Sequence, residues 1–325
     1  MKRAAILVGL AVPLFLFGGC GNHGGFGQPD SGTEPDGSPF GMDGGFQPSD
    51  AAPPDGGGVT LIYAHTDTEL YTLDPTTQMV VDVGPFQVGG AAAPTITDLA
   101  VNAAGDVWVN SETEIFTAQV PTSPGPVALT RVATIATGNS QAFYALGFAP
   151  AGVLGSGETL VGGDNTGTLY AIASNGSTTE LGAFGTDSSG NPYELSGDIV
   201  FYTQNSEPLG LATIRSCPKG TCNESDDILA EIDVAAMQTA YQTKTPGNMN
   251  KQLLGSGTGY GRLYGVGAWN NSVYAFSRVG SSVPAQLIQI GASGTGSVLQ
   301  SFPSISSGWS GAGVTTNAVI TILPN

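Results

Sequence analysis

Two aspartates stand at equivalent places in two similar short segments of the chain. Asp98 lies in residues 97–101 (TDLAV), and Asp198 lies in residues 197–201 (GDIVF). Ala145 takes that place in a third segment, and Arg262 falls nearby in a fourth, residues 261–266 (GRLYGV). Paired carboxylates can bind a cation such as Ca²⁺ or a polar ligand, and the guanidinium of Arg262 suits a carboxylate or sugar hydroxyls. Alternatively, each aspartate accepts backbone N–H groups in a turn.

Two cysteines, Cys217 and Cys222, are separated by four residues that include Pro218 and Gly220. In an exported chain this pair predicts a local disulfide, which contributes at most about 2–3 kcal/mol because the loop is short. A redox pair favours two intervening residues, and a zinc site needs about four ligands, with no histidine in this region. The acidic residues 224–227 (ESDD) that follow are interpreted as a solvated turn, with Ca²⁺ binding as the alternative.

Histidine chemistry has two candidates after the first twenty residues, His23 and His65. His65 lies in residues 64–69 (AHTDTE), a predicted hairpin turn, so we expect its side chain to be solvated. The sequence has no G-x-S-x-G, H-E-x-x-H or Walker motif. This pattern favours a binding or scaffold module over an enzyme. The alternative function is a metal-dependent hydrolase or lactonase that uses carboxylates.

The first twenty residues carry two basic side chains, then an apolar stretch, then small residues before Cys20. This order predicts an export signal. Residues 17–20 (FGGC) resemble the lipobox of bacterial lipoproteins, which implies cleavage before Cys20 and attachment of lipid to it. Acyl chains at about 0.8 kcal/mol per buried CH₂ would hold the protein on a membrane. By the same resemblance, Gly21 favours the outer membrane or cell surface. An ordinary signal peptide with an incidental cysteine is the alternative.

Residues 21–58 are rich in Gly, Pro and Asp and contain no Lys or Arg. They have too few apolar side chains to form a core, so this segment is predicted to be a disordered tether. As a Gly-rich coil it would span roughly 30–37 Å.

Residues 59–325 differ in composition from the preceding segment and contain short runs of β-branched and aromatic residues separated by turn residues. This pattern predicts an all-β domain with many antiparallel strands. Similar strands contain Leu70, Ile115, Leu169, Leu229 and Leu287, at an average spacing of about 54 residues. One helix is expected over residues 233–243. A pair of β-sandwiches is the alternative fold.

This repeat of strands is typical of β-propeller blades and resembles the YVTN- and NHL-type propellers of secreted bacterial proteins. The length predicts about five four-stranded blades, with six as the alternative. Residues 311–316 and 319–323 are expected to pair with the N-terminal strands and close the ring. In such a propeller, Asp98, Asp198 and Arg262 would face one mouth of the central channel.

The net charge of the chain restricts the classes of partner that it is expected to bind. The chain has 9 Lys and Arg against 26 Asp and Glu, a net charge of −17, and its basic residues are scattered. The sequence therefore predicts no nucleic-acid partner, because backbone-driven binding requires clustered basic residues. The expected partners are the membrane, through the lipid, and a protein or carbohydrate ligand. No cofactor is predicted.

Overall fold

A computed structural model describes residues 62–136, 138, 141–204, 207–269, 272–278 and 284–318. Contacts between Cα atoms divide the chain between Met42 and Asp43, and every described residue belongs to the second unit. The predicted signal, Cys20, the tether and the terminal strand at 319–323 lie outside the described residues. Within the described part, no helix has the length and apolar character needed to cross a membrane.

The first strands form a nine-stranded sheet made of two meanders. The first meander contains β1 (Ile62–His65), β2 (Glu69–Asp74) and β3 (Met79–Val88), with the short β4 (Ala91–Ala92) paired to β3. The second contains β5 (Asp98–Val101), β6 (Val107–Asn110), β7 (Glu114–Gln119) and β8 (Val127–Thr134). A parallel pairing of β3 with β8 joins the two meanders at their outer strands. The C-terminal β22 (Gly311–Gly313) pairs antiparallel with β1.

Three further sheets follow along the chain. One contains β9 (Phe143–Ala149), β10 (Thr159–Asp164), β11 (Thr168–Ile172) and β12 (Thr178–Ala183), with β16 (Gly247–Asn248) at its edge. The next contains β13 (Tyr193–Gln204), β14 (Glu207–Ser216), β15 (Ile228–Ile232) and β17 (Asn250–Leu254). The last contains β18 (Leu263–Trp269), β19 (Ser272–Ser277), β20 (Ala285–Ile290) and β21 (Gly296–Phe302).

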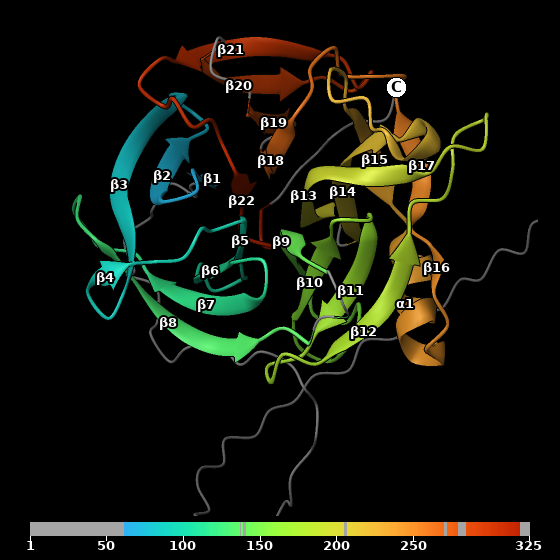
Figure 1. The fold of residues 1–325 in the computed structure, drawn as a ribbon, viewed down its shortest axis with the longest axis horizontal. Coiled ribbons are helices and arrows are strands. Elements are labelled where there is room, and N and C mark those ends of the chain that lie inside the picture. The colour runs from blue at the N-terminus through green and yellow to red at the C-terminus, as the bar shows by residue number, and fades with distance from the viewer. Residues whose placement is uncertain are drawn as a thin grey trace, which may run out of the picture. The chain divides into compact units, whose positions relative to one another are not determined.

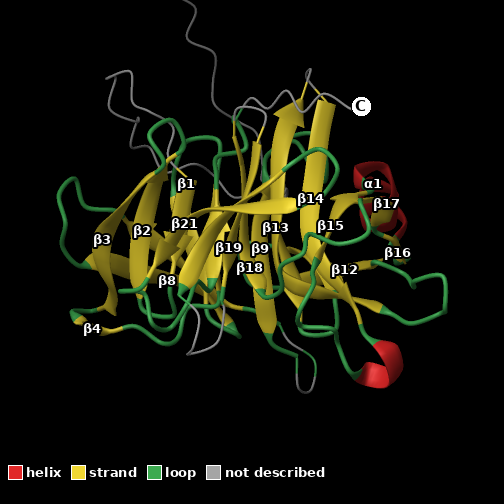
Figure 2. Cartoon of the chain, turned by 90° about the horizontal axis from the view of Figure 1, so that it is seen from above, coloured by secondary structure: helices red, strands yellow, loops and turns green. Residues whose placement is uncertain are grey.

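The sheets stand radially around one axis, as Figure 1 shows. The strands nearest the axis are β22, β5, β9, β13 and β18, and each contacts the next in this order, with β18 contacting β22. From the side, β9, β13 and β18 run in the same general direction (Figure 2). This all-β, radial arrangement is that of a β-propeller.

The five residues that the sequence marked as equivalent occupy equivalent places. Each lies in the third strand outward from the axis, and each is at most 1% exposed. These strands are β2, β7, β11, β15 and β20, and the residues are Leu70, Ile115, Leu169, Leu229 and Leu287. The core is built from both faces of each sheet, because neighbouring sheets pack face to face. The repeat predicted from the sequence is therefore correct at these positions.

Two short helices interrupt the strands. The 3₁₀ turn η1 (Pro218–Gly220) lies between the two cysteines, and α1 (Val234–Thr243) follows β15. Asp233 caps α1 by accepting a hydrogen bond from the Ala236 N–H at 2.9 Å. Met237 and Ala240 are the buried residues of α1, which lies against β12 and β16 at the outer edge (Figure 2). The helix predicted over residues 233–243 is confirmed.

Candidate functional site

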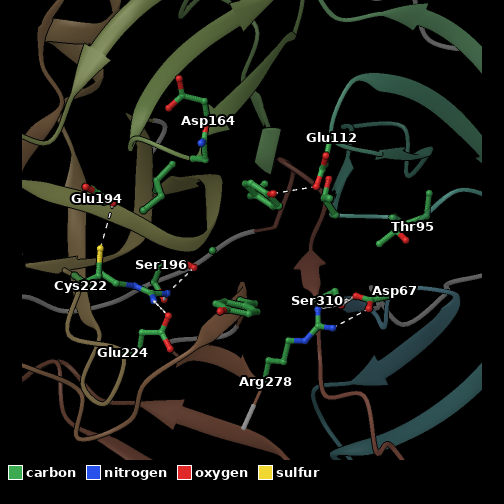
Figure 3. Close-up of a pocket in the computed structure, with 18 residues that line it drawn as sticks. Asp67, Thr95, Glu112, Asp164, Glu194, Ser196, Cys222, Glu224, Arg278 and Ser310 are labelled. Atoms are coloured by element: carbon green, nitrogen blue, oxygen red, sulfur yellow. Dashed lines mark hydrogen bonds and ion pairs between the residues drawn. The ribbon is translucent and has the colours of Figure 1, made fainter. Parts of the chain in front are cut away.

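One end of the axis is hollowed by a cavity of about 530 Å³. Every sheet contributes to its lining, through turns and the first residues of the strands nearest the axis (Figure 3). Asp67 comes from the β1–β2 turn, Glu112 from the β6–β7 turn and Asp164 from the end of β10. Glu194 and Ser196 come from β13. We call this hollow the axial cavity.

Two arginines in the wall of the axial cavity are held by carboxylates of the protein. Arg278 forms a two-pronged ion pair with Asp67, with both N–O distances at 2.7 Å. Ser310 donates to the same carboxylate and also accepts from Arg278. Two parallel charge-assisted bonds fix both side chains in one geometry. The guanidinium beside Asp67 holds the pKa of that carboxyl below its usual range, against the effect of its partial burial.

Arg215 is the second arginine of the wall, and it is only 5% exposed. Its Nη2 donates to the Ser196 carbonyl at 2.8 Å and to the Ser196 hydroxyl at 2.5 Å. Its Nη1 lies 3.8 Å from Glu224, and its Nε lies 3.5 Å from Asp227. The guanidinium also lies over the ring of Tyr264, 5.8 Å from the ring centre. Arg215 is therefore held in place while its Nη1 forms no hydrogen bond with the described residues.

Asp227 lies behind the cavity wall and contacts Arg215 and Ser196. Its side chain is fully buried, and its Oδ2 accepts hydrogen bonds from the Ser196 hydroxyl and from the Leu263 N–H. Burial raises its pKa to about 6, although Arg215 acts in the opposite direction. The sequence-based interpretation of residues 224–227 as a solvated turn is wrong for this residue, because the β14–β15 connection folds back onto β13 and β18.

A disulfide joins Cys217 to Cys222, as the sequence predicted. Cys217 is fully buried, whereas Cys222 lines the axial cavity with its Sγ 3.2 Å from Glu194 Oε2. Glu194, Cys217 and Cys222 are the one group of three metal-type ligands found close together among the described residues. Because the two sulfurs are bonded to each other, they offer no thiolate for a metal.

Asp98 and Asp198 meet beneath the axial cavity. Both are fully buried, and the residues just before them, Thr97 and Gly197, line the cavity instead. Asp98 accepts from the N–H groups of Leu99 at 2.8 Å and Leu146 at 2.6 Å. The carboxyl groups of Asp98 and Asp198 hydrogen-bond to each other. The structure thus brings together the two aspartates that the sequence singled out.

Asp198 makes matching bonds on its side of the axis. Its oxygens accept from the N–H groups of Ile199 at 2.6 Å and Val266 at 2.5 Å, and the Ala312 N–H also contributes. Burial raises the pKa of both Asp98 and Asp198 well above the usual value, since two close carboxylates cannot both ionise in a dry site. The raised pKa values favour a proton held between the two carboxyl groups, and the backbone bonds of this pair tie the strands nearest the axis together.

His65 is fully buried as the last residue of β1. The prediction of a solvated turn histidine is wrong, because the turn begins one residue later and β22 covers the ring. Its Nδ1 bonds the Thr66 carbonyl at 2.7 Å, and its Nε2 lies 3.9 Å from Asp98 Oδ1 without a hydrogen-bond partner. Burial lowers its pKa to about 4, so the ring is neutral at ordinary pH.

Arg262 lies apart from the two aspartates. Its Nη2 pairs with Glu224 at 2.5 Å, and its side chain is 40% exposed. Glu224 belongs to the lining of the axial cavity. Arg262 therefore acts on the cavity through Glu224, and the structure does not bring it to Asp98 or Asp198.

Sequence reasoning missed most of the acidic lining. A signal was present, because Asp67 and Glu112 stand three residues before Leu70 and Ile115 in the repeat. A further acidic position, five residues before the equivalent leucine, holds Asp164 and Glu224. All four of these acids line the axial cavity. An alignment of the repeat at its turns, rather than at its strands, would have found them.

Comparison with known proteins gives matches only among solved structures. No family model matches the chain, and no curated protein matches it. A protein of unknown function from Bacteroides caccae is 10% identical, covers 79% of this chain and 98% of its own length, and has a TM-score of 0.40. A chain of the nidogen/laminin complex is 14% identical, with coverages of 79% and 98% and a TM-score of 0.42. Function is therefore argued from the site itself.

Proposed function

We propose that the protein is a binding module that holds a ligand in the axial cavity. The observation that carries this proposal is the cavity itself, to which every sheet contributes side chains. Its volume of about 530 Å³ lies within the range of roughly 300–1,000 Å³ typical of ligand sites. Both arginines of its wall are held by ion pairs with carboxylates of the protein, so this part of the site is formed before a ligand arrives.

The scaffold of this module is a ring of five blades. Support comes from four complete meanders, which begin at β5, β9, β13 and β18, and from β1–β3, to which β22 adds a fourth strand. In this arrangement β22 closes the ring by pairing the last described strand with the first. A closed ring keeps five groups of turns at fixed positions around one mouth.

The module is displayed on the outside of a membrane. Lipid on Cys20 would hold the chain at the outer membrane or cell surface, and residues 21–58 would hold the propeller away from the lipid. This part of the proposal rests on the FGGC segment and on the composition of the tether. The ligand is then a molecule outside the cell, either a protein or a carbohydrate, and the net charge of −17 argues against nucleic acid.

Arrays of peptides and glycans test the binding function. The full chain, with Cys20→Ser for solubility, is applied to both arrays, and each bound compound is then used in hydroxyl-radical footprinting. We expect a bound compound to protect Tyr144, which lines the axial cavity and is 40% exposed. Tyr241, on α1 outside the cavity lining, is the control and should stay unprotected. Binding that leaves Tyr144 unprotected, or no binding on either array, would contradict the proposal.

A further inference from the structure

The lining of the axial cavity has an excess of negative charge on one side. Its five carboxylates face two guanidiniums, and both guanidiniums already contact carboxylates of the protein. Glu112, Asp164 and Glu194 remain without an ion pair among the described residues. These three come from the second and third meanders and from β13, so one half of the cavity wall is acidic.

Each of these three carboxylates is in a different state of hydrogen bonding. Asp164 is only 2% exposed. Its Oδ1 accepts from Thr166 and Thr168 of its own turn, and its Oδ2 accepts from Gln141 and Tyr170. Glu112 accepts from the Tyr144 hydroxyl at 3.0 Å. The carboxylate of Glu194 has only the Cys222 sulfur at 3.2 Å, which carries no hydrogen in a disulfide. Partial burial raises the pKa of Glu194, the charge of the neighbouring Arg215 acts against this, and the charge of Asp164 adds to it.

The spacing of the carboxylates does not suit a single metal ion. No three of the described acidic, histidine or cysteine ligand atoms other than Glu194 and the disulfide lie within 4.8 Å of one another. A Ca²⁺ site needs 6–8 oxygens at about 2.3–2.6 Å. Separated carboxylates around a cavity suit a larger cation, whose N–H groups reach more than one of them. The exposed ring of Tyr144 adds a face for such a cation.

Next to Glu194, the paired strand β14 presents a donor, because Arg215 is the cross-strand neighbour of Glu194. Arg215 is more than nine-tenths buried, its Nε has no hydrogen-bond acceptor, and its Nη1 has only Glu224 at 3.8 Å. A guanidinium at the cavity wall with an unused N–H favours a ligand oxygen nearby. A simple amine carries no such oxygen. A peptide carries both, because its backbone carbonyls are acceptors and a lysine or arginine side chain supplies the cation.

From these contacts we infer that the axial cavity binds a peptide segment of another protein that presents a lysine or arginine side chain. The basic side chain lies on the side of Glu112, Asp164 and Glu194, and a peptide carbonyl accepts from Arg215. This inference rests on the proposed binding function and names its ligand class.

Calorimetric titration tests this ligand class on the full chain carrying Cys20→Ser. The probes are capped pentapeptides of glycine with one central lysine, arginine, glutamate or alanine, together with n-butylamine, spermidine and Ca²⁺. We expect the lysine and arginine peptides to bind at least about tenfold more tightly than n-butylamine, because only they offer a carbonyl. Their affinity should fall with added salt, since the interaction is between charges.

A charge-removing variant locates the cation. The double substitution Glu112→Gln with Glu194→Gln keeps oxygen acceptors in place, so the fold should be retained, and peptide affinity should fall at least about tenfold. Glu207→Gln, at the exposed start of β14 outside the cavity, is the matched control and should leave affinity unchanged.

Four results would overturn the inference. If n-butylamine or spermidine bound as tightly as the lysine and arginine peptides, the peptide oxygen would have no role. If Ca²⁺ bound more tightly than any peptide, the ligand would be a metal ion and not an organic cation. Unchanged affinity in the double variant would move the cation elsewhere. Binding of only neutral glycans, with protection of Tyr144, would refute the basic peptide while leaving the binding function intact.

Discussion

At the scale of single residues, the carboxyl pair of Asp98 and Asp198 stabilises the strands nearest the axis. Both oxygens of Asp98 accept a strand N–H, from Leu99 and from Leu146. In Asp98→Asn, either orientation of the amide turns its NH₂ toward one of these donors. We expect a loss of about 2 kcal/mol or more in the free energy of unfolding, measured by urea denaturation. Asp82→Asn, on the exposed part of β3, is the control. A loss no larger than that of the control would contradict this account.

The same pair predicts how stability depends on pH. Burial raises the folded-state pKa of Asp98 and Asp198 above 3.8. Their contribution to the free energy of unfolding is therefore fully present below pH 3.8 and is lost as pH rises. The contribution of Asp227, whose pKa is about 6, is lost in the same direction. The contribution of His65 to the free energy of unfolding depends on pH in the opposite direction, because it is lost as pH falls from 6.5 toward about 4.

Above about pH 7.5, the ionisation of Asp227 and the deprotonation of His65 in the unfolded chain are nearly complete, so the carboxyl pair should dominate the change in stability. We expect the urea midpoint to fall between about pH 7.5 and about pH 9, before tyrosines with raised pKa values begin to ionise. Denaturation curves over this range check the prediction. A flat or rising midpoint would show that the pair does not hold a proton in the folded protein.

The sequence shows that Asp98 and Asp198 are equivalent in the repeat, but it does not show that they are buried. Their equivalence follows from strand patterns, which a single chain displays. Their environment depends on strands far away in the chain, such as β18, whose Val266 N–H bonds to Asp198 from 68 residues away. The same limit explains His65, whose burial depends on β22 at the other end of the chain.

At the scale of elements, β22 is held against β1 by close packing at Gly311. A Cβ atom on Gly311 would lie 2.1 Å from Asp98 Oδ1 and 2.3 Å from His65 Nε2, and both neighbours are fully buried. Gly311→Ala should therefore lower the free energy of unfolding by about 1–3 kcal/mol or more. Thermal and urea denaturation measure this loss. At Gly157 a Cβ meets nothing within 4 Å, so Gly157→Ala is the control. Equal stability of the two variants would refute the packing of β22 at the axis.

Elements were the most predictable level of this protein. Alternating strands, the helix at Val234–Thr243 and the disulfide all follow from local patterns or from two nearby residues. The parallel pairings of β3 with β8 and of β12 with β16 were not predicted. The first joins the outer strands of two meanders, and the second adds β16 to the edge of the sheet that ends at β12. Nothing in the local alternation of side chains specifies such partners.

At the scale of the whole molecule, the proposed lipid on Cys20 would decide where the axial cavity operates. Cys20→Ser should move the protein from the membrane fraction to the soluble fraction, because the acyl chains would be lost. Partitioning into detergent, compared between wild type and variant, measures the change. Ser49→Ala, in the predicted tether, is the control and should stay in the membrane fraction. A membrane fraction that does not change in Cys20→Ser would contradict lipid attachment at this residue.

The most direct test of the account is to fill the axial cavity. Thr95 is exposed at the rim of the cavity and forms no hydrogen bond recorded among the described residues, so Thr95→Trp should place a large side chain over the mouth without unfolding the protein (Figure 3). Thr122→Trp, in an exposed turn between β7 and β8, is the matched control. Affinity for the tightest ligand from the arrays is measured for both variants by calorimetry. The account predicts at least about a tenfold loss for Thr95→Trp and none for Thr122→Trp. Equal affinity in wild type and Thr95→Trp would contradict a ligand site in the axial cavity.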